Sequence, residues 1–241
     1  MAGPVTPEPA PGFSPRYRSG SRRARWAVAL LVTAGFVALF SLVHQLGALG
    51  LIDRAVAGQL TVSQADEYDV TTALLALLQL AVLLATGVAF LAWLSRTVDN
   101  VPSLGGGVPS VTPRWSIGWW FVPIMNLYRP FLIVRDTYRR LAGSGETGSG
   151  MIVAWWVAWV ANDLLGIIAL TRPAPETLDA LRTEVVSASF NDLLTMIAAV
   201  LAVVVVREVE GRAEARAAEL AARAEVPPPP AELPPVDLPP V

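Results

Sequence analysis

Four apolar stretches, each about 20 residues long, constrain this chain more than any other feature of its sequence, because about 20 mostly apolar residues are what a helix needs to cross a bilayer. The stretches are rich in Leu, Ala and Val on all sides rather than along one face, which is typical of spanning or buried helices. They cover residues 26–46, 71–94, 151–170 and 185–206. The sequence therefore predicts an all-α integral membrane protein with four transmembrane helices.

The composition supports this class and excludes much chemistry. Of the 241 residues, 54% are apolar and only 16% are charged, whereas soluble domains carry about 25% charged residues. The chain has no Lys and no Cys, and His44 is its only histidine. Lysine-dependent phosphate loops, Schiff-base catalysis, thiolate nucleophiles and zinc–thiolate sites are therefore excluded. We expect no enzymatic activity, cofactor or metal, and the net charge of −2 gives no indication of nucleic-acid binding.

The arginines are distributed unevenly around the four stretches. Fifteen of the 18 lie before the first stretch, between the second and third, or after the fourth, and three lie in the other two connections. Cytoplasmic segments of membrane proteins carry the excess of basic residues. We therefore expect both termini to be cytoplasmic. The first stretch is interpreted as a retained anchor rather than a cleaved signal peptide, because no convincing cleavage site follows it.

A fifth apolar segment, residues 115–134, is long enough to span but has the wrong residues for it. Pro123 and Pro130 each remove a backbone donor and disrupt a helix interior. Asn126 and Arg129 would lie deep in hydrocarbon, where an arginine costs about 2.5–3.5 kcal/mol. A fifth span would also reverse the arginine asymmetry. We expect a Trp/Pro-rich interfacial or re-entrant segment between the second and third transmembrane helices.

A set of ten residues in and before this segment, mostly Trp, Pro, Asn and Gly, carries a family resemblance. The residues are Trp93, Arg96, Asn100, Trp115, Gly118, Trp119, Pro123, Asn126, Leu127 and Pro130. Their spacing resembles the bacterial, mostly actinobacterial, multi-pass membrane family called domain of unknown function 4328, over roughly residues 72–206. The resemblance implies the same architecture in a bacterial plasma membrane, and it implies no reaction.

The remaining segments are interpreted as tails and linkers. Residues 1–25 are rich in Pro and Arg and predict a disordered cytoplasmic tail. Residues 143–150 contain a formal G-x-G-x-x-G pattern, but their position before a membrane span predicts a flexible linker. Residues 207–225 predict a charged, solvated helical extension with i, i+4 ion pairs. Residues 226–241 predict a Pro-rich disordered tail that serves as a spacer more readily than as a peptide ligand.

Polar residues inside the four stretches form a second candidate site. The tetrapeptide Asn-Asp-Leu-Leu occurs in both the third and the fourth stretch. By counting 1.5 Å per residue, its polar members fall at a similar depth to polar groups of the other two stretches. The set comprises His44, Gln79, Asn162, Asp163, Asn191 and Asp192. Two interpretations stay open: hydrogen bonding that fixes the register of the bundle, which we favour, and a proton or cation site.

Two functional hypotheses follow from these patterns. The leading one is a non-enzymatic membrane scaffold or sensor that engages a partner or anionic lipid through its cytoplasmic region 93–140. That region holds six Arg and four Trp, which suit anionic headgroups or a protein groove. The alternative is a small oligomeric transporter or channel subunit that uses Asp163 and Asp192. Membrane lipids are the expected partners at the cytoplasmic arginines, and a homo-oligomer or protein partner stays open.

Overall fold

The fold is helical throughout the part of the chain that the computed structural model describes, which is residues 13–14, 16–142 and 150–225. Four long helices are apolar enough to cross a membrane, so the predicted fold class is confirmed. The helices are α1 (Ser21–Val56), α2 (Val62–Asn100), α3 (Pro113–Gly118), α4 (Arg129–Ala142), α5 (Gly150–Thr171) and α6 (Leu178–Glu225), with 3-10 turns η1 (Pro102–Leu104) and η2 (Met125–Leu127).

Local sequence sets several helix boundaries. Thr61 and Gln64 form a capping box at the start of α2, each side chain bonding to the backbone of the other residue. Gly58 makes the preceding turn with a positive φ of 67°, a conformation that glycine adopts without steric cost. Thr112 caps α3 and Pro113 occupies its first turn, where a missing N–H is tolerated.

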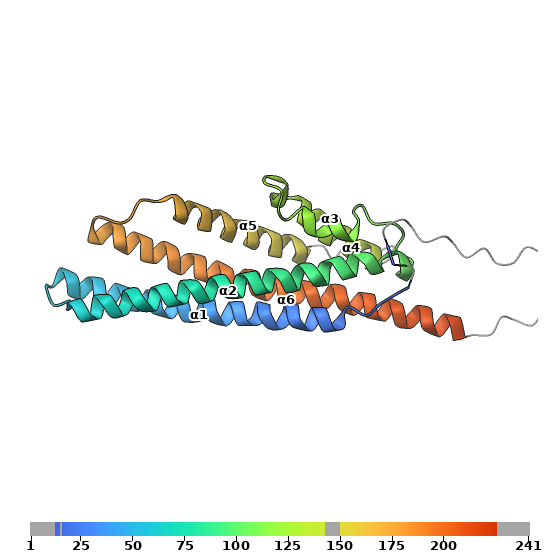
Figure 1. The fold of residues 1–241 in the computed structure, drawn as a ribbon, viewed down its shortest axis with the longest axis horizontal. Helices are drawn as coiled ribbons and strands as arrows, with labels where there is room; N and C mark the ends of the chain where they lie inside the picture. The colour runs from blue at the N-terminus through green and yellow to red at the C-terminus, as the bar shows by residue number, and fades with distance from the viewer. Residues whose placement is uncertain (1–12, 15, 143–149, 226–241) are drawn as a thin grey trace, which may run out of the picture.

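The four long helices pack side by side (Figure 1), with α1 against α6, α2 on the other side of α1, and α5 on the other side of α6. We call one end of this bundle the Trp end. It comprises the first turns of α1 and α5, the last turns of α2, and α6 beyond Val206. The opposite end, which holds the connections α1–α2 and α5–α6, is the short-loop end.

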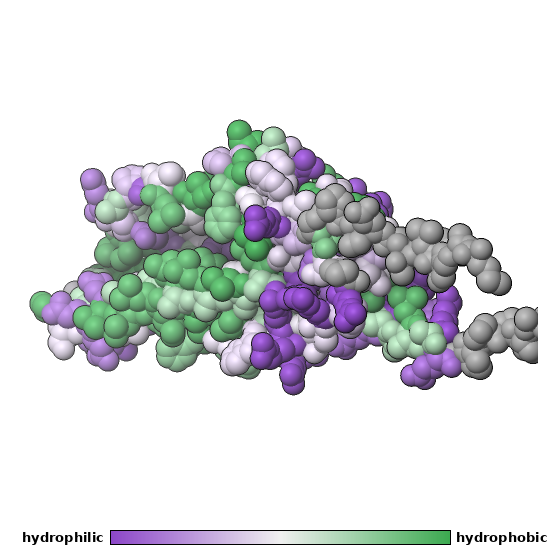
Figure 2. All heavy atoms as spheres, turned by 45° about the vertical axis from the view of Figure 1, so that its right-hand side comes forward, coloured by the Kyte–Doolittle hydropathy of each residue, from purple (hydrophilic) through white to green (hydrophobic). Residues whose placement is uncertain are grey.

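Packing is unequal at the two ends. The main core lies toward the Trp end, where Trp93, Val98, Val205 and Val206 are completely buried. A small cluster of Ala48, Ile52 and Val185 joins α1 to α6 at the short-loop end. Figure 2 shows hydrophobic side chains covering much of the long helices, and large apolar side chains such as Phe36, Leu83 and Val200 are exposed there. So extensive an apolar surface is rare on soluble proteins and fits contact with lipid.

The segment 115–134 does not form a continuous helix. It divides into the six-residue α3, an irregular stretch, the turn η2 and the start of α4. Pro123 precedes the turn and Pro130 lies in the first turn of α4, so each proline stands where its missing N–H breaks no helix interior. The segment is therefore too short in helical length to cross a bilayer, and it lies beside α5 as a separate element (Figure 1).

Two parts of the chain differ from the expected tails. Helix α1 begins five residues before the first apolar stretch, and residues 16–20 just before it pack on the Trp end with Phe13 and Ser14. Helix α6 continues through residues 207–225, as expected, but Val209 and Ala213 are buried rather than solvated. The expectations for residues 1–12, 143–149 and 226–241 lie outside the described residues.

Candidate membrane-interface site

The segment 119–128, which we call the wedge, is attached to α5 near the Trp end. The indole Nε1 of Trp156 donates a hydrogen bond to the backbone carbonyl of Leu127, at 3.0 Å. Trp156 lies six residues after Gly150, the first residue of α5, which is about 9 Å along the helix at a rise of 1.5 Å per residue. The wedge therefore lies at the depth of the tryptophan residues that begin α5.

Aromatic contacts fix the wedge against two long helices. The Trp120 ring lies 5.9 Å from Trp156 and 5.5 Å from Trp159, both on α5, and 5.6 Å from Phe90 on α2, measured between ring centroids. All three pairs meet edge to face. Such pairs contribute about 0.5–1.5 kcal/mol each beyond their buried area. Trp120 is therefore the anchor of the wedge.

The tip of the wedge is strained and apolar. Ile124 has a φ of 66°, and it is the one described residue other than glycine with a positive φ. A β-branched residue in this region costs of the order of 1–3 kcal/mol, which the surrounding contacts must offset. The strained turn leaves Phe121 74% exposed and Ile124 76% exposed. The aromatic anchor thus lies inward and two large apolar side chains lie outward.

Arginine is the charged component of the wedge region. The guanidinium of Arg129 lies 4.6 Å from the centroid of the Trp119 ring, a cation–π contact. Arg96 and Arg140, in contrast, are paired with aspartates. No ion pair involves Arg129 within the residues that the structure describes. Its positive charge is therefore held in place by an aromatic ring, with no carboxylate partner in the part of the chain that the structure describes.

Two buried polar atoms of the wedge have no hydrogen-bond partner among the described residues. They are the indole Nε1 of Trp120, a donor, and the amide Oδ1 of Asn126, an acceptor. A buried donor or acceptor without a partner costs about 1–3 kcal/mol, and most such groups in proteins are satisfied. Both atoms therefore mark a place where another polar group is expected.

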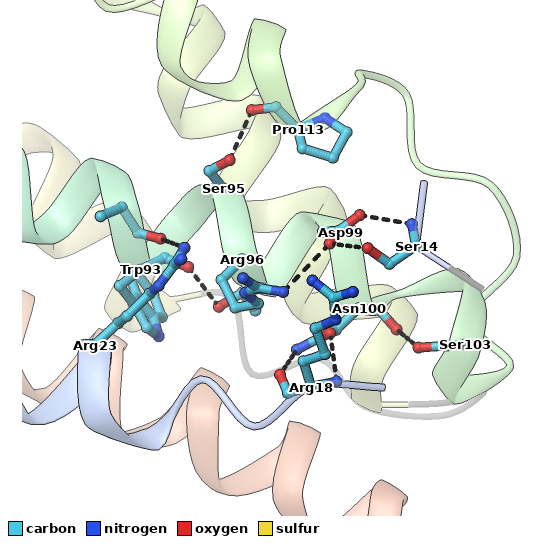
Figure 3. A network of polar contacts seen from close by, with 12 residues as sticks. Ser14, Arg18, Arg23, Trp93, Ser95, Arg96, Asp99, Asn100, Ser103 and Pro113 are labelled. Carbon is cyan, nitrogen blue, oxygen red and sulfur yellow. Dashed lines mark hydrogen bonds and ion pairs between the residues drawn. The ribbon is translucent and has the colours of Figure 1, made fainter. Parts of the chain in front are cut away.

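Two family-motif residues near the end of α2, Arg96 and Asn100, do not join the wedge but hold the N-terminal segment (Figure 3). The Asn100 side chain accepts from the backbone N–H of Arg18 at 3.2 Å and donates to its carbonyl at 2.9 Å. Asp99 accepts from the N–H and the hydroxyl of Ser14, at 2.8 and 2.7 Å, and Arg96 pairs with Asp99. Arg96, Asp99 and Asn100 therefore form a clasp that holds Ser14 and Arg18 across the end of α2.

The last turns of α2 also contact α3, the short helix that leads into the wedge. The hydroxyl of Ser95 donates to the carbonyl of Pro113, the first residue of α3, at 3.0 Å (Figure 3). Gly118 ends α3, and a Cβ on it would lie 3.0 Å from the Trp115 ring. The motif residues thus lie in two places, the last turns of α2 and the segment 115–130, which includes the wedge.

Glu210 is a buried residue that the sequence analysis missed. Its Oε2 accepts from the Trp93 indole at 3.0 Å, whereas its Oε1 has no partner in the described part of the chain. Burial raises the pKa of Glu210, and the hydrogen bond from Trp93 opposes that rise. The i, i+4 pair of Glu208 and Arg212 suggested a solvated helix. The informative signal was the spacing of Glu210 from Val206 and Ala213, which places it on the apolar face.

The predicted polar layer divides into separate contacts. His44 bonds to Thr72 at 2.9 Å and stacks on Tyr68. Gln79 donates to Asp192 at 3.0 Å, which joins α2 to α6. The Asn162 Oδ1 accepts a hydrogen bond from Thr195 at 2.8 Å. The Asn191 Oδ1 is buried and has no hydrogen-bond partner among the described residues. No hydrogen bond of the Asp163 side chain occurs among the described contacts. The structure shows no contact between the two aspartates in its described residues.

Together, the four spanning helices and the wedge define a class: an all-helical, multi-pass membrane protein with an additional non-spanning segment at one end. The chain belongs to the family described as domain of unknown function DUF4328, whose family model matches residues 57–211, more than half of the chain. No curated protein and no solved structure matches the chain. The match includes the clasp on α2, the wedge and Glu210, whereas residues 13–20 lie outside it.

Proposed function

We propose that this protein is a non-enzymatic scaffold or sensor module of the bacterial plasma membrane that engages anionic lipid through its region 93–140. The observation that carries the proposal is the wedge itself. Phe121 and Ile124 are exposed in the wedge, and Arg129, which directly follows it, packs on Trp119 and has no carboxylate partner among the described residues. Apolar side chains next to an arginine and several tryptophans suit the boundary between acyl chains and headgroups.

The depth of the wedge supports lipid rather than a soluble partner as its ligand. The hydrogen bond from Trp156 holds Leu127 level with the tryptophans near the Trp end, and indole rings prefer the headgroup level of a bilayer. The arginine asymmetry favours the Trp end as the cytoplasmic side, with both termini there. Anionic lipids of the inner leaflet attract basic residues by about 1 kcal/mol each near the surface.

The transporter or channel hypothesis receives less support. It required Asp163 and Asp192 to share one site, but Asp192 bonds to Gln79 on α2 while Asp163 has no described contact with it. Hydrogen bonding between helices accounts for the contacts of Gln79, Asp192 and Asn162 without a transported ion. We therefore keep lipid engagement by the wedge as the proposed function.

The experiment compares lipid retention by matched arginine variants. The full-length protein is reconstituted in nanodiscs of phosphatidylcholine with phosphatidylglycerol, and lipid retained after mild extraction is quantified by native mass spectrometry. Arg129→Gln should reduce the preference for phosphatidylglycerol about fivefold, which corresponds to about 1 kcal/mol. Arg54→Gln removes the same charge from an exposed residue at the short-loop end and should change the preference little. Equal effects of the two variants, or none, would contradict the proposal.

A further inference from the structure

A groove lies between α1 and α2, and none of its residues belongs to the wedge. This α1–α2 groove has a volume of about 310 Å³ and is lined by Thr33, Phe36, Val37, Phe40, Leu75 and Leu78. Phe36 and Phe40 are 67% and 62% exposed, so both rings are open to whatever surrounds the helices. The volume is at the lower end of small-ligand sites, which measure about 300–1,000 Å³. The groove therefore offers an apolar surface to a hydrocarbon chain.

One face of α1 connects the α1–α2 groove with the Trp end. Its residues follow one another at intervals of three or four, which places them on the same side of a helix, and all of them are exposed. They are Arg22, Trp26, Ala29, Thr33, Phe36 and Phe40. The buried residues Ala27, Leu31 and Ala38 lie on the opposite side of α1. From the Trp end inward, this face therefore presents a charge, an indole and then apolar rings.

The arginines where this face meets the Trp end have no carboxylate partners of their own. Among the described residues, no ion pair involves Arg22 or Arg23. Arg23 reaches from α1 to α2, where its Nη1 donates to the carbonyl of Ala92 at 2.9 Å (Figure 3). It is repelled by the charges of Arg96 and Arg22 and attracted by Asp99, which already pairs with Arg96. A further anion at this place would therefore reduce the repulsion.

The distance from the arginines to the α1–α2 groove matches the depth of one lipid leaflet. Thr33 and Phe40 lie 11 and 18 residues after Arg22, which is about 16 and 27 Å along the helix at 1.5 Å per residue. A bilayer with its headgroups is about 40–45 Å thick, so its middle lies about 20–22 Å from the headgroup surface. The acyl chain of a lipid whose phosphate lies at Arg22 and Arg23 would therefore end in the groove.

We propose that the α1–α2 groove binds one acyl chain of an anionic phospholipid from the leaflet at the Trp end, and that Arg22 and Arg23 hold its phosphate. Guanidinium groups are well suited to phosphate, and Trp26 lies one turn further along the same face, where indole rings favour the headgroup boundary. A lipid fits better than a second copy of the chain, because the same face of a second α1 would bring like charges together. The site is independent of lipid binding by the wedge.

Photochemical cross-linking tests which lipid occupies the α1–α2 groove. Full-length protein is reconstituted in phosphatidylcholine vesicles with a trace of phosphatidylglycerol that carries a diazirine at the methyl end of one chain. A parallel sample receives phosphatidylcholine with the same diazirine chain, and cross-linked residues are located by peptide mass spectrometry. At Phe36 and Phe40, phosphatidylglycerol should cross-link about fivefold more than phosphatidylcholine, the effect of about one arginine near a charged headgroup. Leu164, exposed on α5 and 14 residues after Gly150, should show no such difference.

Three variants separate the headgroup contact from the groove. Arg22→Gln combined with Arg23→Gln should lower the phosphatidylglycerol signal at Phe36 to the phosphatidylcholine level. Arg129→Gln removes a charge from the wedge region instead and should leave that signal unchanged. Leu78→Trp should fill the groove and reduce cross-linking by both lipids. Leu78 is 47% exposed, so the larger side chain should leave the fold intact, which circular dichroism would check.

Two results with the unmodified protein would overturn the proposal. Equal cross-linking by the two lipids at Phe36 and Phe40 would show that the α1–α2 groove is filled by bulk lipid without selection of the headgroup. No more cross-linking at Phe36 and Phe40 than at Leu164 with either lipid would show that the groove holds no chain. Neither result bears on the wedge, whose lipid preference is measured separately by the comparison of Arg129→Gln with Arg54→Gln.

Discussion

Gly20, at the start of α1, contacts a carboxylate from another helix. A Cβ at this residue would lie 2.8 and 2.9 Å from the two carboxylate oxygens of Glu210. The φ of Gly20 is −88°, so the backbone itself would accept any residue, and the restriction comes from packing alone. Gly20 and Trp93 therefore enclose Glu210 from α1 and α2, which joins three helices at the Trp end.

Replacement of Gly20 tests this close approach. Gly20→Ala should displace the Glu210 carboxylate from its hydrogen bond with Trp93 and so destabilise the protein by about 1 kcal/mol. Gly47 also lies in α1, but a Cβ there meets nothing within 4 Å. Gly47→Ala should therefore stabilise by about 1 kcal/mol through helix propensity. The two midpoints of unfolding in mixed detergent would be compared, and equal shifts would show that Gly20 is not packed on Glu210.

The pH dependence of stability tests the burial of Glu210. Burial raises the pKa of this carboxyl above its ordinary value of 4.5, so the folded protein holds the proton to a higher pH than the unfolded chain does. The contribution to stability is complete below 4.5 and is lost as the pH rises through the raised value. The free energy of unfolding should thus fall with pH across this window, and Glu210→Gln should flatten the slope. If the free energy of unfolding fell equally with pH in the unmodified protein and in Glu210→Gln, the pH dependence would not come from a buried Glu210.

At the scale of elements, the sequence predicted what depends on local composition. Apolar runs predicted the spanning helices, and Pro123 with Pro130 predicted the break in the segment 115–134. The clasp could not be predicted from the sequence, because Arg18 and Asn100 are far apart in the chain and meet only when it is folded. The polar layer was predicted by depth alone, whereas contact also depends on direction around the helix.

The helical angle explains why the two aspartates do not pair. Asn162 faces Thr195 on α6, and the next residue, Asp163, is rotated by about 100° because a helix has 3.6 residues per turn. Asp192, in contrast, faces Gln79 and is buried. Equal depth therefore placed the two carboxylates in one layer without placing them on facing surfaces.

Replacement of the two aspartates should separate their roles. Asp192→Leu leaves the Gln79 amide without its acceptor and should destabilise the protein by about 1–3 kcal/mol. Asp163→Leu breaks no described hydrogen bond and should change stability by less than about 0.5 kcal/mol. Unfolding of both variants would be followed by circular dichroism in mixed detergent. Equal destabilisation would show that Asp163 also belongs to an interhelical contact.

At the scale of the whole molecule, helix α6 determines how the protein extends from the membrane. Its 48 residues span about 72 Å at 1.5 Å per residue, more than twice the hydrocarbon thickness of about 30 Å. The helix is therefore longer than a bilayer is thick, and its residues beyond Val206 pack on other elements of the Trp end. Arg216 donates to the carbonyl of Leu104 in η1, and Arg212 lies over the Tyr138 ring of α4. The extension thus supports the region that leads into and out of the wedge.

The proposed orientation can be tested with single cysteines, because the chain has none. Gln59 is exposed in the α1–α2 turn, and Val108 is exposed between η1 and α3. With both termini cytoplasmic, an impermeant maleimide should label Gln59→Cys in intact cells and Val108→Cys only after the cells are opened. The reverse pattern would place the Trp end outside and invert the proposed topology.

The depth of the wedge in the bilayer can be measured directly. A single cysteine at Ile124 would be labelled with an environment-sensitive fluorophore, and the protein reconstituted in vesicles containing lipids brominated near the headgroup or deep in the acyl chains. A wedge at the headgroup boundary should give strong quenching by the shallow bromine and weak quenching by the deep one, with little of either at Val108→Cys. Absence of quenching at residue 124 would place the wedge in water, and stronger quenching by the deep bromine would place it in the bilayer centre. Either result would contradict insertion at the headgroup boundary.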